Sequence, residues 1–171
     1  MFKYIYRLSW QLVLAALIFV SFSTTTHAST QARQFVFNGG LGVFVGTEGL
    51  DASFDISLEP EYFFTEHTSL SFRFDITAGG TDSVHFGTRF RYYFDIPHHE
   101  RINIFVGAGI GGGVTFDGAG FGDVAIPVFG WQYDITKHFK IGSDVSFDLV
   151  FNSDNLAFAT RLMPVVLKYA F

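Results

Sequence analysis

The sequence predicts an all-β protein: an eight-stranded antiparallel up-and-down transmembrane β-barrel. Apolar residues make up 49% of the 171-residue chain and aromatic residues 19%, with 23 phenylalanines, whereas charged residues fall to 16%. A soluble domain usually has about a quarter of its residues charged. From residue 29 onward, apolar and polar residues alternate with the two-residue period of a strand. Together these observations indicate a sheet with one face in an apolar environment.

The first 28 residues have the pattern of a signal peptide. Lys3 and Arg7 precede an apolar run at 12–20, and the segment THA at 26–28 provides the small side chains of a cleavage site. The run is shorter than the roughly 20 residues that cross a membrane as a helix, which counts against the alternative of an uncleaved anchor. The predicted barrel domain is therefore 29–171.

Charge and cysteine content exclude several classes of partner. Removal of the predicted signal peptide takes away two basic residues and moves the formal net charge from −5 to −7. A chain this acidic has no basic surface for nucleic acid, which we exclude as a partner. Cysteine is absent, so disulfides and thiolate metal sites are excluded as well. We expect no metal site and no cofactor.

Eight strands account for the alternation. The clearest is LSFRFDI at 70–76, where apolar and polar side chains alternate without a break. The segment 123–134 is the least regular. One predicted face carries Ala125, Pro127, Phe129, Trp131 and Tyr133, but the other is also apolar, with Val124, Ile126 and Val128. Pro60, Pro127 and Pro164 each remove a ladder hydrogen bond and are expected to mark bulges or strand ends. The predicted strands are 34–45, 53–64, 68–78, 83–94, 101–114, 123–134, 138–151 and 156–171.

The charged faces of these strands are predicted to point into the barrel. The opposite faces carry almost no charge, with Arg161 as the exception. Side chains just fill the interior of an eight-stranded barrel, so the many aromatic residues do not fit inside. We therefore expect the apolar faces to meet lipid, in contrast to a soluble sandwich or lipocalin-like barrel. The predicted lumen charge network is Asp55, Glu59, Glu61, Arg73, Asp75, Arg89, Arg91, Lys140, Asp144, Asp148 and Lys168.

Aromatic residues gather beside the even-numbered connections and the C-terminus. Membrane barrels carry such girdles at the membrane–water interfaces, where amphipathic rings are favoured. The predicted girdle comprises Tyr62, Phe63, Phe64, Tyr92, Phe94, Trp131, Tyr133, Phe139, Tyr169 and Phe171.

The C-terminal sequence PVVLKYAF resembles the last strand of bacterial outer-membrane barrels. Val165, Leu167, Tyr169 and Phe171 alternate up to a terminal aromatic residue. With its signal peptide and eight predicted strands, the chain resembles the small OmpA/OmpX-type outer-membrane barrels over nearly its whole length. The resemblance implies that these four residues are an assembly signal read by the outer-membrane barrel assembly machinery. It also implies a place in the outer membrane of a Gram-negative bacterium, in contact with lipid and lipopolysaccharide, and we expect a monomer.

The resemblance further implies an orientation, with both termini in the periplasm. The outside loops would then be 46–52, 79–82, 115–122 and 152–155, and all four are short. Adhesins of this class carry long exposed loops, so the short loops count against an adhesin.

A glycine-rich stretch matches a nucleotide-binding pattern without its context. GAGIGG at 107–112 fits the dinucleotide fingerprint, but that fingerprint requires a following helix within a βαβ unit. No helical periodicity appears after residue 28. We expect Gly107, Gly109 and Gly111 to line the lumen and to leave room for a bulky neighbour across the barrel.

One candidate catalytic group occurs near a predicted outer rim. Ser83 and His85 point to the same side of a strand and Asp82 is adjacent, which is the minimum for nucleophilic acyl chemistry. Lipid A deacylases of the barrel class carry His-x-Ser followed by Asn on a late strand, and FDLVFNSDN here lacks the histidine. We favour ordinary polar residues at this place. His98 and His99 lie in a turn and point opposite ways, so they are not expected to share a metal ion.

Three functions follow from these predictions. The first is a non-catalytic barrel with a charge-paired, plugged lumen that contributes to envelope integrity or surface interaction. The second is a lipid A-modifying enzyme, an acyl hydrolase or acyltransferase. The third is a narrow pore for ions or small solutes, which would favour an excess of one sign of charge in the lumen. The near balance of the predicted network favours the first.

Overall fold

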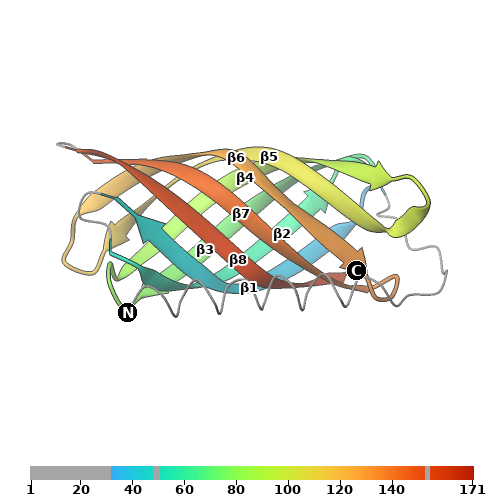
Figure 1. Ribbon diagram of the computed structural model, residues 1–171, viewed down its shortest axis with the longest axis horizontal. Helices are drawn as coiled ribbons and strands as arrows, with labels where there is room; N and C mark the ends of the chain where they lie inside the picture. Colours follow the sequence, from blue (N-terminus) through green and yellow to red (C-terminus); the bar gives the residue numbers. More distant parts are fainter. Residues whose placement is uncertain (1–31, 48–50, 153–154) are drawn as a thin grey trace.

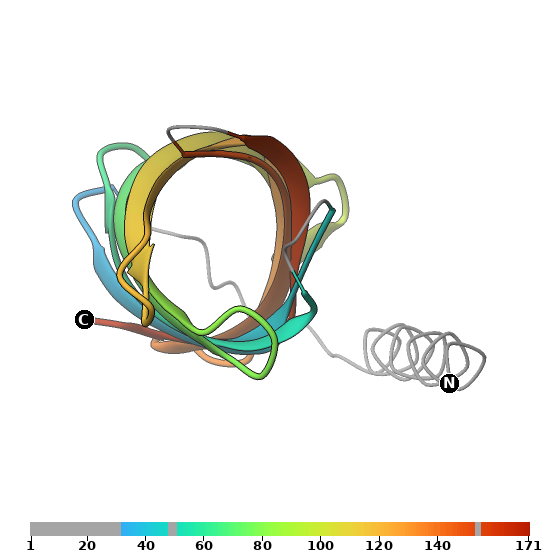
Figure 2. The ribbon, with the colours of Figure 1, turned by 90° about the vertical axis from the view of Figure 1, so that its left-hand side faces the viewer.

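The computed structural model describes residues 32–47, 51–152 and 155–171, and the predicted signal peptide, 1–28, lies outside this part of the chain. Eight strands close into a barrel in which each strand is antiparallel to its neighbours and β1 pairs with β8 (Figure 1, Figure 2). Within the described ranges, no helix is long and apolar enough to cross a membrane. The strands are β1 (Phe35–Gly46), β2 (Ser53–Phe63), β3 (Thr68–Ala78), β4 (Ser83–Ile96), β5 (His99–Thr115), β6 (Gly120–Asp134), β7 (Phe139–Phe151) and β8 (Leu156–Ala170).

The barrel has its polar residues inside and its apolar residues outside. Among the described residues, buried polar or charged side chains outnumber buried apolar ones by 25 to 13. The large apolar side chains instead cover the outer surface, as Phe72 and Phe90 do at 49% and 50% exposed. This arrangement suits hydrocarbon outside, because a closed barrel leaves no edge with unpaired backbone groups. The predicted fold class and the predicted direction of the two faces are both confirmed.

Two of the three prolines mark bulges that reverse the alternation. One extra residue enters β6 between Ala125 and Val128, around Pro127, and another enters β8 around Pro164. A bulge of one residue moves the following side chains to the other face. Pro60 behaves differently from our prediction: β2 passes through it in unbroken register with β1.

These bulges correct two predictions about faces. Arg161 does not lie on the apolar face, because β8 changes phase at Pro164 and the guanidinium enters the lumen, 3% exposed. Ala125 and Phe129 do not share a face, since the bulge between them leaves Ala125 inside and Phe129 outside. Phe63 is also corrected: it points into the lumen, 1% exposed, and does not join the outer aromatic girdle.

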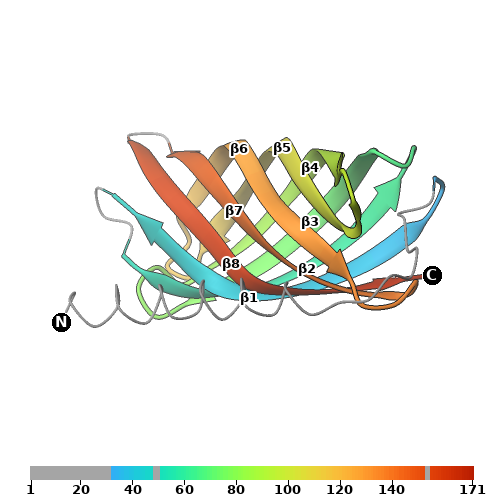
Figure 3. The same cartoon turned by 45° about the vertical axis from the view of Figure 1, so that its right-hand side comes forward.

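The two ends of the barrel differ in what they carry. The C-terminus lies at one end, which we call the inner end (Figure 1, Figure 3). There the backbone N–H of Arg33 donates to Phe63 and that of Phe171 donates to Phe35. The inner end also has the turns between β2 and β3, β4 and β5, and β6 and β7. The opposite, outer end has the remaining four connections, all of them short.

Candidate functional site: the lumen and its outer cavity

The structure places all eleven residues of the predicted charge network inside the barrel, each at most 5% exposed. Four further ionisable residues join them, which the sequence did not assign to the network: His85, Asp123, Asp134 and Arg161. Asp123 and Asp134 lie on β6 and Arg161 lies on β8. These two strands contain the bulges, so the face on which each side chain lies could not be read from simple alternation. His85 was already expected on the polar face of its strand, beside Ser83.

In the inner half of the lumen, Glu61 is the centre of a dense set of hydrogen bonds. It accepts from the Ser69 hydroxyl at 2.6 Å, from Asn38 Nδ2 at 2.9 Å and from the Tyr93 hydroxyl at 2.7 Å. Arg91 Nη1 lies 3.3 Å and Lys168 Nζ 3.7 Å from its carboxylate oxygens. A carboxylate so fully partnered is stable away from water.

Aromatic rings fill the space beside this set. The ring of Tyr93 lies between those of Phe63 and Phe105, with centroids 5.1 Å away on each side. Lys168 Nζ lies 5.3 Å from the centroid of Phe105, and it donates to the Tyr93 hydroxyl at 3.3 Å. The inner half therefore has both a charge network and an apolar cluster in its cross-section.

The middle of the lumen continues the pairing. Arg91 Nη2 contacts Glu59 at 2.7 Å and Asp144 at 3.7 Å. Arg89 Nη1 lies 3.7 Å from the same Asp144, and Ser71 donates to Glu59. At the inner rim, Lys140 Nζ lies 3.1 Å from Asp134. Each of these bases contacts at least one acid.

Glycines on β5 make room for the long side chains of β4. Gly107 is directly opposite Arg91 in the ladder, and Gly109 is opposite Arg89. A Cβ atom on Gly107 would come within 2.2 Å of the Phe90 carbonyl oxygen, and one on Gly109 within 2.8 Å of Arg89 Cγ. The glycine run is thus part of the charge network. The bulky neighbours come from the adjacent strand, not from across the barrel as predicted.

In the outer half, two arginines are shared among several acids. Arg161 Nε lies 2.8 Å from Asp55 and Arg161 Nη1 lies 3.3 Å from Asp148 and 3.9 Å from Asp75. Arg73 contacts Asp75 at 2.5 Å and Asp55 at 3.5 Å. The cations here are fewer than the carboxylates around them.

The imidazole of His85 also belongs to the outer half. Its Nδ1 lies 2.9 Å from Asp75 and its Nε2 lies 2.6 Å from Asp123. The ring stacks on Phe121 at an interplanar angle of 9°. A Cβ atom on Gly111 would come within 2.5 Å of His85 Nε2, so this glycine leaves room for the imidazole.

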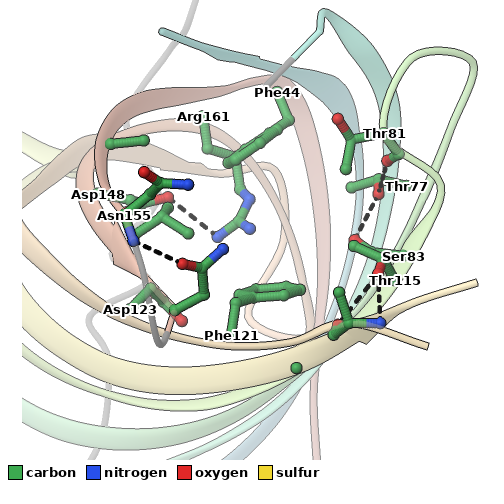
Figure 4. A pocket seen from close by; sticks show the side chains of 15 residues that line it. Phe44, Thr77, Thr81, Ser83, Thr115, Phe121, Asp123, Asp148, Asn155 and Arg161 are labelled. Carbon is green, nitrogen blue, oxygen red and sulfur yellow. Dashed lines mark hydrogen bonds and ion pairs between the residues drawn. The ribbon is translucent and has the colours of Figure 1, made fainter. Parts of the chain in front are cut away.

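A cavity of about 280 Å³ lies between this part of the lumen and the outer end of the barrel (Figure 4). Figure 4 shows the Arg161 guanidinium between the rings of Phe44 and Phe121, with Asp148 and Asp123 on the same side. Thr77, Thr81, Ser83 and Thr115 form the other side. The lining is completed by Ala119, Gly120, Val150, Asn152, Asn155 and Ala157.

The candidate catalytic residues are not assembled into a catalytic group. Both ring nitrogens of His85 contact aspartates, and the Ser83 hydroxyl instead lies 2.7 Å from that of Thr77. Asp82 is exposed and its carboxylate accepts the Gly79 backbone N–H at 2.7 Å in the β3–β4 turn. A nucleophile needs a base within hydrogen-bond reach, and His85 has both of its nitrogens engaged elsewhere.

Apart from Phe63, the predicted girdle and assembly residues lie on the outer surface. Tyr92 and Phe94 contact each other edge to face at 4.8 Å, as do Tyr169 and Phe171 at 5.0 Å. Trp131 and Tyr133 are half-buried on β6, and Tyr62 is 39% exposed. The four residues expected as an assembly signal all point outward from β8 or just after it: Val165, Leu167, Tyr169 and Phe171.

Comparison with known proteins shows the fold and no closer relationship. No family model and no curated protein matches the sequence. Among solved structures, Neisserial surface protein A superposes with a TM-score of 0.64 at 13% identity, over 80% of this chain and 97% of that one. OprG from Pseudomonas aeruginosa gives 0.56 at 12% identity, over 85% and 99%.

The attachment invasion locus protein Ail of Yersinia pestis gives a TM-score of 0.54 at 15% identity, over 82% of this chain and 100% of that one. All three are similar to this chain in the whole barrel. The predicted resemblance to small eight-stranded outer-membrane barrels of the OmpA/OmpX type is confirmed at the level of fold.

Proposed function

We propose that this chain is a non-catalytic outer-membrane protein of a Gram-negative bacterium whose plugged barrel contributes to envelope integrity or surface interaction. The shared fold and the continuous apolar outer surface support a place in that membrane, among lipid and lipopolysaccharide. Export would depend on residues 1–28 and assembly on the C-terminal signal from Val165 to Phe171. We propose that the protein acts as a monomer.

The observation that carries this proposal is the filling of the inner half of the lumen. Tyr93, Glu61, Arg91 and Lys168 meet there in mutual contact, packed against Phe105. Moving an ion through this layer would separate buried charges from their partners, which costs several kcal/mol per ion. These contacts favour a lumen that is blocked to ions.

Conductance in a planar lipid bilayer tests the plug. The purified, refolded barrel should give no steady current, while a large porin inserted under the same conditions serves as the positive control. Discrete, long-lived openings of the unmodified protein would show that the lumen conducts and would replace the plug with a pore.

The lipid A mass spectrum tests the absence of catalysis. Outer membranes with and without the expressed protein should give the same lipid A masses, because the Ser83 hydroxyl contacts Thr77 and both nitrogens of His85 contact aspartates. Gain or loss of one acyl-chain mass that disappears in Ser83→Ala would make the protein an enzyme acting on lipid A.

A further inference from the structure

The outer cavity has a property that a simple plug does not require: its floor is acidic. In the inner half, four acids face four bases: Glu59, Glu61, Asp134 and Asp144 against Arg89, Arg91, Lys140 and Lys168. In the outer half, four acids face two arginines and one histidine: Asp55, Asp75, Asp123 and Asp148 against Arg73, Arg161 and His85. The outer half therefore has a net charge of −1 or −2, with His85 counted as charged or neutral.

One carboxylate of the outer half that lacks a hydrogen-bond donor lines the cavity. Asp148 lines it and is only 2% exposed, yet neither of its oxygens accepts a hydrogen bond from the described residues. Its one ion pair within the described part of the chain joins Oδ2 to Arg161 at 3.3 Å, and that guanidinium also contacts Asp55 at 2.8 Å. A buried carboxylate without a donor is costly, and an added donor would stabilise it.

The other walls of the cavity are suited to an apolar body. Phe44, Phe121, Val150 and Ala157 line it. Aromatic faces attract cations as well as apolar groups, as Arg161 already shows by lying 5.2 Å from the centroid of Phe44. These walls and the carboxylate that lacks a hydrogen-bond donor favour a ligand with one cationic head and a short apolar remainder.

The hydroxyl side of the cavity is already occupied by internal hydrogen bonds. Thr77 donates to the Thr81 carbonyl at 2.7 Å, and Thr115 donates to Asp117 and accepts from the Ala119 backbone N–H. The hydrogen bond from Thr115, and then that from the Ala119 backbone, lower the pKa of Asp117. We therefore expect the acidic side of the cavity, with Asp123 and Asp148, to provide the polar contacts to a ligand.

We propose that the outer cavity binds a small organic cation, with a primary ammonium group donating to Asp148 and its apolar body against Phe121, Val150 and Ala157. Asp123, held by His85, contributes a second negative charge to the same side. The cavity of about 280 Å³ is slightly smaller than the usual range for ligand pockets, roughly 300–1,000 Å³, which favours a small ligand. This site goes beyond the proposed function, and it does not depend on whether the lumen conducts.

The test uses two probes of the same shape, phenethylamine and the neutral phenethyl alcohol. Each is titrated into the isotope-labelled, detergent-solubilised barrel at neutral pH, and backbone amide chemical shifts are followed. Phenethylamine should give saturable shifts at Phe121, Asp123 and Asp148 and none at Glu59 or Glu61. The alcohol should give no saturable shifts, because it lacks the charge that pairs with a buried carboxylate.

Two matched variants separate the cavity from general surface charge. Asp148→Asn should weaken phenethylamine binding at least about tenfold, since it removes the charged acceptor. Asp82→Asn removes the same charge from an exposed turn that does not line the cavity, and it should leave the affinity unchanged.

Three results would overturn the proposal. The first is the absence of saturable shifts with phenethylamine. The second is equal binding of the alcohol, which would mean an apolar pocket without a cation preference. The third is an equal loss of affinity in Asp82→Asn and Asp148→Asn. The two-probe comparison on the unmodified protein decides the matter even if Asp148→Asn does not fold.

Discussion

The inner and outer halves of the lumen are built on the same eight strands with the same alternation, yet they balance charge differently. In the inner half, four acids meet four bases, and Glu61 alone accepts three hydrogen bonds. In the outer half, the acids exceed the permanent cations by two, and Asp148 accepts no hydrogen bond from the described residues. The comparison teaches that one inside-out pattern can build a structural plug at one end and a candidate binding site at the other.

The physical reason lies in the cost of burying charge. An ion taken out of water costs several kcal/mol unless partners compensate it. In the inner half, acids and bases of the chain itself compensate this cost, so their contacts stabilise the fold. The outer half leaves part of the cost uncompensated beside a cavity, where a ligand can supply the missing donor.

The largest expected effect comes from removing a base of the inner half. Arg91→Met leaves Glu59 and Glu61 without their guanidinium partner and should lower the free energy of unfolding by about 3–5 kcal/mol. Urea unfolding in lipid vesicles measures it. Lys137→Met, an exposed cation in the β6–β7 turn, is the control and should stay within about 0.5 kcal/mol. Equal stability of both variants would show that the ion pairs of Arg91 do not stabilise the inner half.

A second test sharpens the role of the β5 glycines. Gly107→Ala would place a Cβ atom within 2.2 Å of the Phe90 carbonyl oxygen, so it should lower the free energy of unfolding by about 1–3 kcal/mol. Gly39→Ala is the matched control, because nothing lies within 4 Å of the added Cβ atom. If the two alanine variants unfold at the same urea concentration, the close packing of β4 against β5 is not a source of stability.

A smaller effect is expected from one hydroxyl of the inner cluster. Tyr93→Phe removes the group that donates to Glu61 at 2.7 Å and accepts from Lys168 at 3.3 Å, which should cost about 1–2 kcal/mol. Tyr92→Phe removes a neighbouring hydroxyl on the outer surface, 41% exposed, and should be nearly neutral. A larger loss in Tyr92→Phe would place the stabilising contact at the membrane interface, not in the lumen.

The sequence was sufficient for the fold because the alternation is strong wherever strands are regular. Residues 70–76, for example, alternate without interruption, and β3 presents the predicted faces in the structure. The charge of Arg73 and Asp75 on one face and the aromatic load on the other could be assigned to lumen and lipid from the limited interior of eight strands alone.

The candidate site was less predictable, because it depends on bulges and on contacts between strands. Arg161 could be placed inside only with the phase change at Pro164 known, and Asp123 lies on the strand with the bulge at Pro127. Sequence spacing paired His85 with Ser83, whereas the closed barrel places it between Asp75 and Asp123. A proline in the middle of an alternating run, followed by a change of phase, was the signal available.

The most direct test of the difference between the halves compares two aspartates on one face of β7. Asp144→Asn removes a carboxylate that contacts both Arg89 and Arg91. Asp148→Asn removes a carboxylate that contacts Arg161, and Arg161 retains its contact with Asp55. By urea unfolding in vesicles at neutral pH, Asp144→Asn should lose about 3 kcal/mol of unfolding free energy and Asp148→Asn less than about 1 kcal/mol. Equal losses, or a larger loss in Asp148→Asn, would contradict the unequal charge balance of the two halves.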